Sequence, residues 1–134
     1  MNVYQELKEK ARDISVLCVD DDTEIREEIS TFLEKFFKSV ESAENGTEAL
    51  VKYKKNRHDI LITDIKMPGL DGISLFDMVK ELNPNIQHII ISGFDIEDYF
   101  IEALIAGVQH YIKKPVDNEQ LIKTLLTCID QLAK

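Results

Sequence analysis

The sequence predicts a single α/β domain, built as a doubly wound sheet of five parallel strands with helices on both faces. Short apolar runs alternate along the chain with longer segments whose apolar residues recur at helical spacing. The clearest apolar run, Ile60–Ile62, shows no polar alternation, which is typical of a parallel strand buried on both faces. A chain of 134 residues is long enough for one domain with a substantial core and too short for two.

The elements follow one another without a linker or repeat. An amphipathic helix, with Val3, Leu7 and Ala11 at helical spacing, opens the chain and could pack on the domain or on a partner. We therefore divide the chain into a helical lead-in, residues 1–13, and a main domain, residues 14–134. Strands are expected at about residues 14–19, 39–43, 60–62, 88–91 and 109–112, and apolar helix stripes at about residues 25–36, 49–53, 73–82, 96–105 and 121–132.

Cap residues mark where several of these helices start. Asp22, Asp71 and Asp117 each precede an apolar helical pattern, and Asn45 with Glu48 has the spacing of a capping box. Short loops and right-handed crossovers favour the flavodoxin-like strand order 2-1-3-4-5, which places the first and third strands side by side.

Composition and charge exclude several classes of function. Hydrophobic residues at 44% and charged residues at 31% describe an ordinary globular chain, and no apolar run is long enough to cross a bilayer. With no signal peptide visible, we expect a cytoplasmic location. A net charge of -9 argues against direct binding to nucleic acid, because that affinity depends on clustered cations. Cys18 and Cys128 have neither metal-ligand spacing nor a disulfide framework.

Polar side chains follow the predicted strands at the edge where ligands bind in open parallel sheets. Asp20 and Asp21 follow the first strand and Asp64 the third, while Ser92 and Lys114 follow the fourth and fifth. Carboxylates this close repel one another, which raises a pKa or recruits a cation, and oxygen ligands suit magnesium. The lysine and the hydroxyl suit a tetrahedral anion beside the metal. The chemistry implied is an aspartate that accepts a phosphoryl group.

Four motifs in this order resemble the receiver domain of two-component response regulators. They are Val19-Asp20-Asp21, Asp64-x-x-Met67-Pro68-x-x-Asp71-Gly72, Ser92-Gly93 and Lys114-Pro115. The resemblance spans nearly the whole chain. It implies a domain that assists its own phosphorylation and dephosphorylation rather than a conventional turnover enzyme, and that takes its phosphoryl group from a sensor histidine kinase or a phosphotransfer protein.

The resemblance also assigns roles to individual residues. It implies that Asp64 is the phosphoacceptor and that magnesium is bound by Asp20, Asp21, Asp64 and the backbone carbonyl of Lys66. Ser92 would donate a hydrogen bond to the phosphoryl group, and Lys114 would form an ion pair with it. Ser92 and Tyr111 would form a switch, and the Lys114–Pro115 bond would be cis.

Two further expectations concern signal lifetime and output. Lys66 and Phe94 stand at positions that tune dephosphorylation in the family, and neither carries the acid or amide that could orient an attacking water. The helix over Ile96–Ile105 has more apolar surface than one buried stripe requires, so we expect a contact face for a second copy or an effector, switched together with the last strand and helix.

Three other functions share parts of this pattern. A hydrolase of the haloacid dehalogenase type needs its nucleophile on the first strand, where Glu24 breaks the required pattern. A flavin-binding domain needs a phosphate-cradling loop after the first strand, where this chain is acidic. A receiver-like scaffold that is never phosphorylated is disfavoured by the complete set of acids, hydroxyl and lysine. The domain could stand alone or belong to a longer regulator or hybrid kinase.

Overall fold

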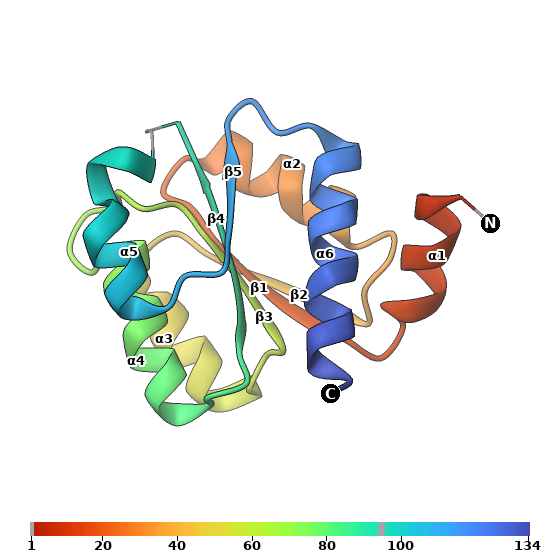
Figure 1. The fold of residues 1–134 in the computed structure, drawn as a ribbon, viewed down its shortest axis with the longest axis horizontal. Coiled ribbons are helices and arrows are strands. Elements are labelled where there is room, and N and C mark those ends of the chain that lie inside the picture. The colour runs from red at the N-terminus through yellow and green to blue at the C-terminus, as the bar shows by residue number, and fades with distance from the viewer. Residues whose placement is uncertain (1, 94–95) are drawn as a thin grey trace.

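Five parallel strands form the centre of the molecule (Figure 1). The computed structural model describes residues 2–93 and 96–134. The strands are β1 (Ser15–Val19), β2 (Ser39–Ala43), β3 (Ile60–Thr63), β4 (Gln87–Ser92) and β5 (His110–Lys113). Their order is β2-β1-β3-β4-β5, and every pair is parallel, so the predicted topology is confirmed.

Helices connect the strands and cover both faces of the sheet. They are α1 (Val3–Lys10), α2 (Thr23–Leu33), α3 (Gly46–Asn56), α4 (Gly72–Leu82), the 3-10 turn η1 (Ile96–Tyr99), α5 (Phe100–Ala106) and α6 (Asn118–Leu132). The predicted caps hold: side chains of Asp22, Asn45, Asp71 and Asp117 each accept a backbone N–H at the start of a helix. No helix among the described residues combines the length and the apolar character needed to span a bilayer.

The core is divided by the sheet into two apolar clusters. One lies between the sheet and α1, α2 and α6, and includes Ile29, Leu33 and Leu125. The other lies between the sheet and α3, α4 and α5, and includes Tyr53, Phe76 and Val79. Because both faces of the sheet are covered, the carboxyl ends of the strands are the natural place for polar chemistry.

The N-terminal helix packs on the domain itself. Leu7 and Ala11 are fully buried in the cluster that α2 and α6 share, and Nζ of Lys10 lies 3.4 Å from Oδ1 of Asp130 on α6. The division into a lead-in and a main domain stays a prediction, but residues 3–11 contribute to the same core as the rest of the chain.

One predicted element is corrected. The apolar stripe over Ile96–Ile105 predicts a single helix from about Asp95 to Ala106; the structure has a 3-10 turn followed by a short α-helix there, and Asp95 lies outside the described residues. Tyr99, at the junction, makes no side-chain cap bond. The turn contains Ile, Asp and Tyr, which are weak helix formers, so local propensity explains why the α-helix starts only at Phe100.

Candidate functional site

Backbone hydrogen bonds continue the strand pairing one residue beyond β1 and one residue beyond β3, and so fix two acids at the carboxyl edge of the sheet. The amide of Asp20 donates to the carbonyl of Ala43, and the amide of Asp64 donates to the carbonyl of Val19, each at 3.2 Å. Because β1 and β3 are neighbours, Asp20 and Asp64 lie side by side, 3% and 8% exposed respectively.

Lys114 joins these two acids. Its Nζ lies 2.7 Å from Oδ2 of Asp64 and 3.0 Å from Oδ2 of Asp20. The backbone amide of Lys114 donates to the carbonyl of Ser92 at 2.9 Å, so the end of β4 sets the position from which the lysine reaches across the sheet edge. The Lys114–Pro115 bond is cis, as expected.

Burial and pairing act in opposite directions on the charges of this cluster. Burial raises the pKa of Asp20 above its usual value, and the negative charge of Asp64 adds to the effect, while hydrogen bonds from Asp22 and Lys114 oppose it. For Lys114, burial lowers the pKa, but the hydrogen bonds with Asp64 and Asp20 outweigh it and the net shift is upward. Lys114 therefore stays charged between the two acids.

The second oxygen of Asp64 is held by its own loop. The amide of Ile65 donates to Oδ1 at 2.6 Å, so both oxygens of the carboxylate accept hydrogen bonds from fixed donors. The loop returns to α4 through a bond from Gly72 N to Ile65 O at 2.8 Å. A Cβ at Gly72 would lie 1.9 Å from the carbonyl oxygen of Asp64, so only glycine allows this close return.

The structure brings Asp20, Asp64 and Lys114 together and leaves Asp21 outside that group. The Asp21 side chain is exposed and lines an open depression with Glu44 and Pro68. Among residues 2–93 and 96–134, no three acidic, histidine or cysteine side chains form a group able to hold a metal ion. Lys66 is exposed in the loop after β3.

The cluster still fits a magnesium ion. Two buried carboxylates share one ammonium group, which leaves a net negative charge presented by oxygen donors. Magnesium is usually bound through one or two carboxylates and keeps several of its waters, so a third protein acid in contact is not required. The roles of Asp21 and of the Lys66 carbonyl stay predictions.

The remaining predicted residues lie around this cluster and its output side. Ser92 is fully buried at the end of β4. Tyr111 is half-buried on β5 and lines a small pocket with Phe100 and Leu104 of α5. Phe94 lies outside the described residues. Four large apolar side chains of α5 are more than half exposed: Phe100, Ile101, Leu104 and Ile105.

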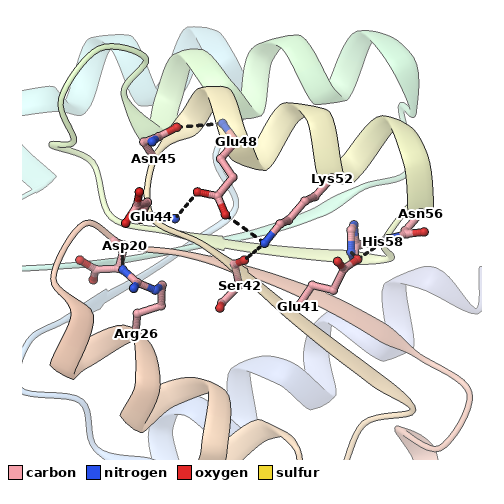
Figure 2. A network of polar contacts seen from close by, with 10 residues as sticks. All are labelled: Asp20, Arg26, Glu41, Ser42, Glu44, Asn45, Glu48, Lys52, Asn56 and His58. Carbon is pink, nitrogen blue, oxygen red and sulfur yellow. Dashed lines mark hydrogen bonds and ion pairs between the residues drawn. The ribbon is translucent and has the colours of Figure 1, made fainter.

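Sequence reasoning missed Arg26, which lies beside the acids (Figure 2). Its Nη1 donates to the backbone carbonyl of Asp20 at 2.8 Å, and with the stronger effect of Lys52 it helps to lower the pKa of Glu48. Its spacing in the sequence could have indicated this, because a residue four positions after the Asp22 cap lies on the same side of the helix as the cap, one turn along. Arg26 thus holds the loop that carries Asp20.

Comparison with known proteins agrees with the geometry. The family model described as "Response regulator receiver domain" matches residues 16–126. The chemotaxis protein CheY of Bacillus subtilis is 32% identical over 111 residues, which cover 82% of this chain and 92% of that protein. The uncharacterized transcriptional regulatory protein YesN of the same organism is 41% identical over 92 residues, covering 69% of this chain but only 25% of YesN. The chain thus spans about a quarter of the longer regulators that it matches.

A solved structure gives the same result. The CheY-like receiver domain protein from Methanospirillum hungatei superposes with a TM-score of 0.85 at 29% identity, covering 90% of this chain and 97% of that one. Receiver domains interact with histidine kinases or phosphotransfer proteins and, as a family, bind magnesium. The fold, the edge cluster and these matches together lead to one assignment: this chain belongs to the family of response regulator receiver domains of two-component systems.

Proposed function

We propose that Asp64 is the phosphoacceptor of this receiver domain and that Lys114 stabilises the phosphoryl group during transfer. The observation that carries the proposal is the pair of contacts that Lys114 makes, 2.7 Å to Asp64 and 3.0 Å to Asp20. A buried carboxylate held by two fixed donors is positioned for attack, and the ammonium group beside it offsets negative charge on the transferring group.

In the proposed reaction, a carboxylate oxygen of Asp64 attacks the phosphorus of a phosphohistidine on the partner kinase or phosphotransfer protein. The new O–P bond forms as the N–P bond breaks, and the imidazole leaves as the neutral base after taking a proton from solvent. Water later hydrolyses the acyl phosphate and regenerates the carboxylate. Asp20, Asp21, Asp64 and the Lys66 carbonyl would hold magnesium, which, when bound, would neutralise charge on the phosphoryl oxygens. The domain assists these steps without acting as a turnover enzyme.

The output proposal concerns Ser92, Tyr111 and α5. A hydrogen bond from Ser92 to the phosphoryl group, together with inward movement of Tyr111, would shift an existing equilibrium of α5 and β5. The exposed apolar face of α5 supports a contact with a second copy or an effector, because patches of this kind mark interaction sites. Light scattering of wild type and an Ile101→Ser, Ile105→Ser variant, with and without a phosphoryl analogue, tests the second copy directly.

Incubation with a small acyl phosphate and magnesium, followed by intact mass measurement, tests the phosphoacceptor. We expect a single phosphoryl adduct in wild type and none in Asp64→Asn, while Asp77→Asn on the exposed surface of α4 keeps the adduct. An adduct that survives in Asp64→Asn would overturn the assignment. Turnover of a phosphoester would favour the hydrolase, and no adduct in wild type would favour the unphosphorylated scaffold.

A further inference from the structure

A buried polar pair lies directly behind the proposed phosphoacceptor. Thr63 precedes Asp64 in the chain, and its Oγ1 lies 2.8 Å from Nε2 of His88 on β4. Both residues are fully buried. Because side chains alternate along a strand, Thr63 and His88 face α4 and the cluster that contains Phe76. The hydrogen bond therefore connects the end of β3 to the α4 side of the core.

From His88 the contacts continue to the end of α5. The His88 ring stacks on Phe76 of α4, with centroids 4.3 Å apart and an interplanar angle of 18°. Nζ of Lys80, one turn further along α4, lies 5.8 Å from the centroid of the same Phe76 ring. Lys80 also donates to the carbonyl of Ala106, the last residue of α5, at 3.3 Å. We call Thr63, His88, Phe76 and Lys80 the buried row.

Both ends of the buried row lie close to a glycine, although Nζ of Lys80 is the far end of a flexible side chain that could move away from a larger residue. A Cβ at Gly72 would lie 2.7 Å from Oγ1 of Thr63, and a Cβ at Gly107 would lie 2.4 Å from Nζ of Lys80. Gly107 also has a φ of +80°, which favours glycine. The row is therefore in tight contact with the phosphoacceptor loop at one end and with the C-terminus of α5 at the other.

The Lys80 contact adds to the limited apolar packing of α5. The helix has seven residues, of which only Ala103 and Ala106 are buried. A lysine that donates to a carbonyl at the end of a helix also complements its dipole, so Lys80 helps to attach the end of α5 to α4.

His88 bonds to Thr63 through Nε2 of its ring. Among the described residues, Nδ1 of the buried imidazole has no hydrogen-bond partner. Burial lowers the pKa of His88 to about 3, so the ring is neutral near pH 7 and the row responds to position rather than to protonation.

We propose that the buried row is a mechanical link between Asp64 and α5, so that occupation of the phosphoacceptor site shifts the C-terminal end of α5 through Thr63, His88, Phe76 and Lys80. The link runs through residues other than Ser92 and Tyr111, although Tyr111 packs against the same apolar cluster as Phe76. It rests on the proposed role of Asp64. The coupling is reciprocal: a ligand that holds α5 in its shifted position would change the affinity of the site for a phosphoryl analogue by the same factor as the analogue changes the affinity for that ligand.

Backbone amide chemical shifts measured during titration with beryllium fluoride and magnesium test the link. Ile65 reports on the site, and Gly107 and Val108 report on the end of α5. In Lys80→Met and in Thr63→Val, which removes the hydroxyl at nearly constant shape, we expect the Ile65 shift to persist and the Gly107 and Val108 shifts to fall by at least half.

The controls separate this link from general damage and from failure of the phosphoacceptor itself. Thr63→Ser keeps the hydroxyl, and Lys123→Met removes a lysine that pairs with Glu119 outside the row; both should respond as wild type does. An Ile65 shift with undiminished Gly107 and Val108 shifts in Lys80→Met and Thr63→Val would overturn the link alone. No Ile65 shift in wild type would overturn the proposed phosphoacceptor and the link with it.

Discussion

Nζ of Lys114 lies 2.7 Å from Oδ2 of Asp64, a residue fifty positions earlier in the chain, and the same ammonium group reaches Asp20 at 3.0 Å. One cation thus balances part of the charge of two buried acids contributed by neighbouring strands. Because removal of any member leaves the others in an uncompensated low-polarity environment, this cluster is where substitutions should have their largest effects.

Lys114→Met should slow phosphorylation by a small acyl phosphate roughly a hundredfold, because it removes the fixed donor next to the proposed nucleophile. The rate of adduct formation, followed by intact mass, checks this. Lys113→Met is the matched control, since Lys113 is the exposed last residue of β5 and directly precedes Lys114. Equal rates in Lys114→Met and wild type would contradict the role.

Asp20→Asn should weaken magnesium binding roughly tenfold or more, because it replaces a buried charged ligand by a neutral one. Titration calorimetry with magnesium chloride alone measures this without any phosphodonor. Asp22→Asn provides the control, since asparagine caps a helix as well as aspartate does. Asp21→Asn decides whether the exposed acid is also a ligand. An unchanged magnesium affinity in this variant would show that Asp21 is not a magnesium ligand.

His88 should make the protein less stable as the pH falls. Burial, with a smaller effect of His110, lowers the pKa of His88 from 6.5 to about 3. Between these values the unfolded chain binds a proton that the folded chain does not, so the stability is present in full above pH 6.5 and is lost toward pH 3. The slope is at most about 1.4 kcal/mol per pH unit. The free energy of unfolding in urea, measured for wild type and His88→Val between pH 6.5 and pH 3, should fall more steeply in wild type by up to that slope. An equal pH dependence in the two proteins would contradict the prediction.

Leu7→Ala should destabilise the whole domain by about 2–5 kcal/mol, because it leaves a cavity in the cluster shared by α1, α2 and α6. Glu9→Ala, on the exposed side of the same helix, should change the free energy of unfolding little. If α1 melted separately, Leu7→Ala would instead leave the main urea transition unmoved.

The lifetime of the phosphoryl adduct should be long and should change in Lys66→Asn or Phe94→Glu, because these introduce a group able to orient water. Decay of the adduct after removal of the phosphodonor measures it. Lys55→Asn, on the exposed end of α3, serves as the control. Identical decay rates in wild type, the two variants and the control would contradict the prediction.

The sequence was sufficient to predict the sheet and most of the site. Asp20, Asp64 and Lys114 each end an apolar run, and the rules of parallel sheets bring such ends to one edge, so their proximity follows from local pattern and topology. The caps at Asp22 and Asp71 were equally predictable, because a cap bonds only to residues within the same turn.

The parts that could not be predicted depend on side-chain direction or on distant partners. Asp21 follows Asp20 directly, yet its side chain points to solvent, and no residue pattern specifies that. Asp59 lies outside the predicted strand-end acids and reads from the sequence as a surface acid, but its Oδ2 accepts from the backbone amide of Ser15 at 3.0 Å and joins the start of β1 to the start of β3. Thr63 and His88 are 25 positions apart, and their pairing becomes visible only when β3 and β4 are set in register.

The two acids and the lysine arrive from β1, β3 and β5, segments that meet only when the sheet has assembled. A denatured chain therefore lacks the proposed phosphoryl-accepting centre. Heat or urea should reduce the amount of signalling-competent protein in proportion to the unfolded fraction, while each surviving molecule reacts at its full rate. If Asp64 accepts phosphate as proposed, the amount of adduct measures the number of folded molecules.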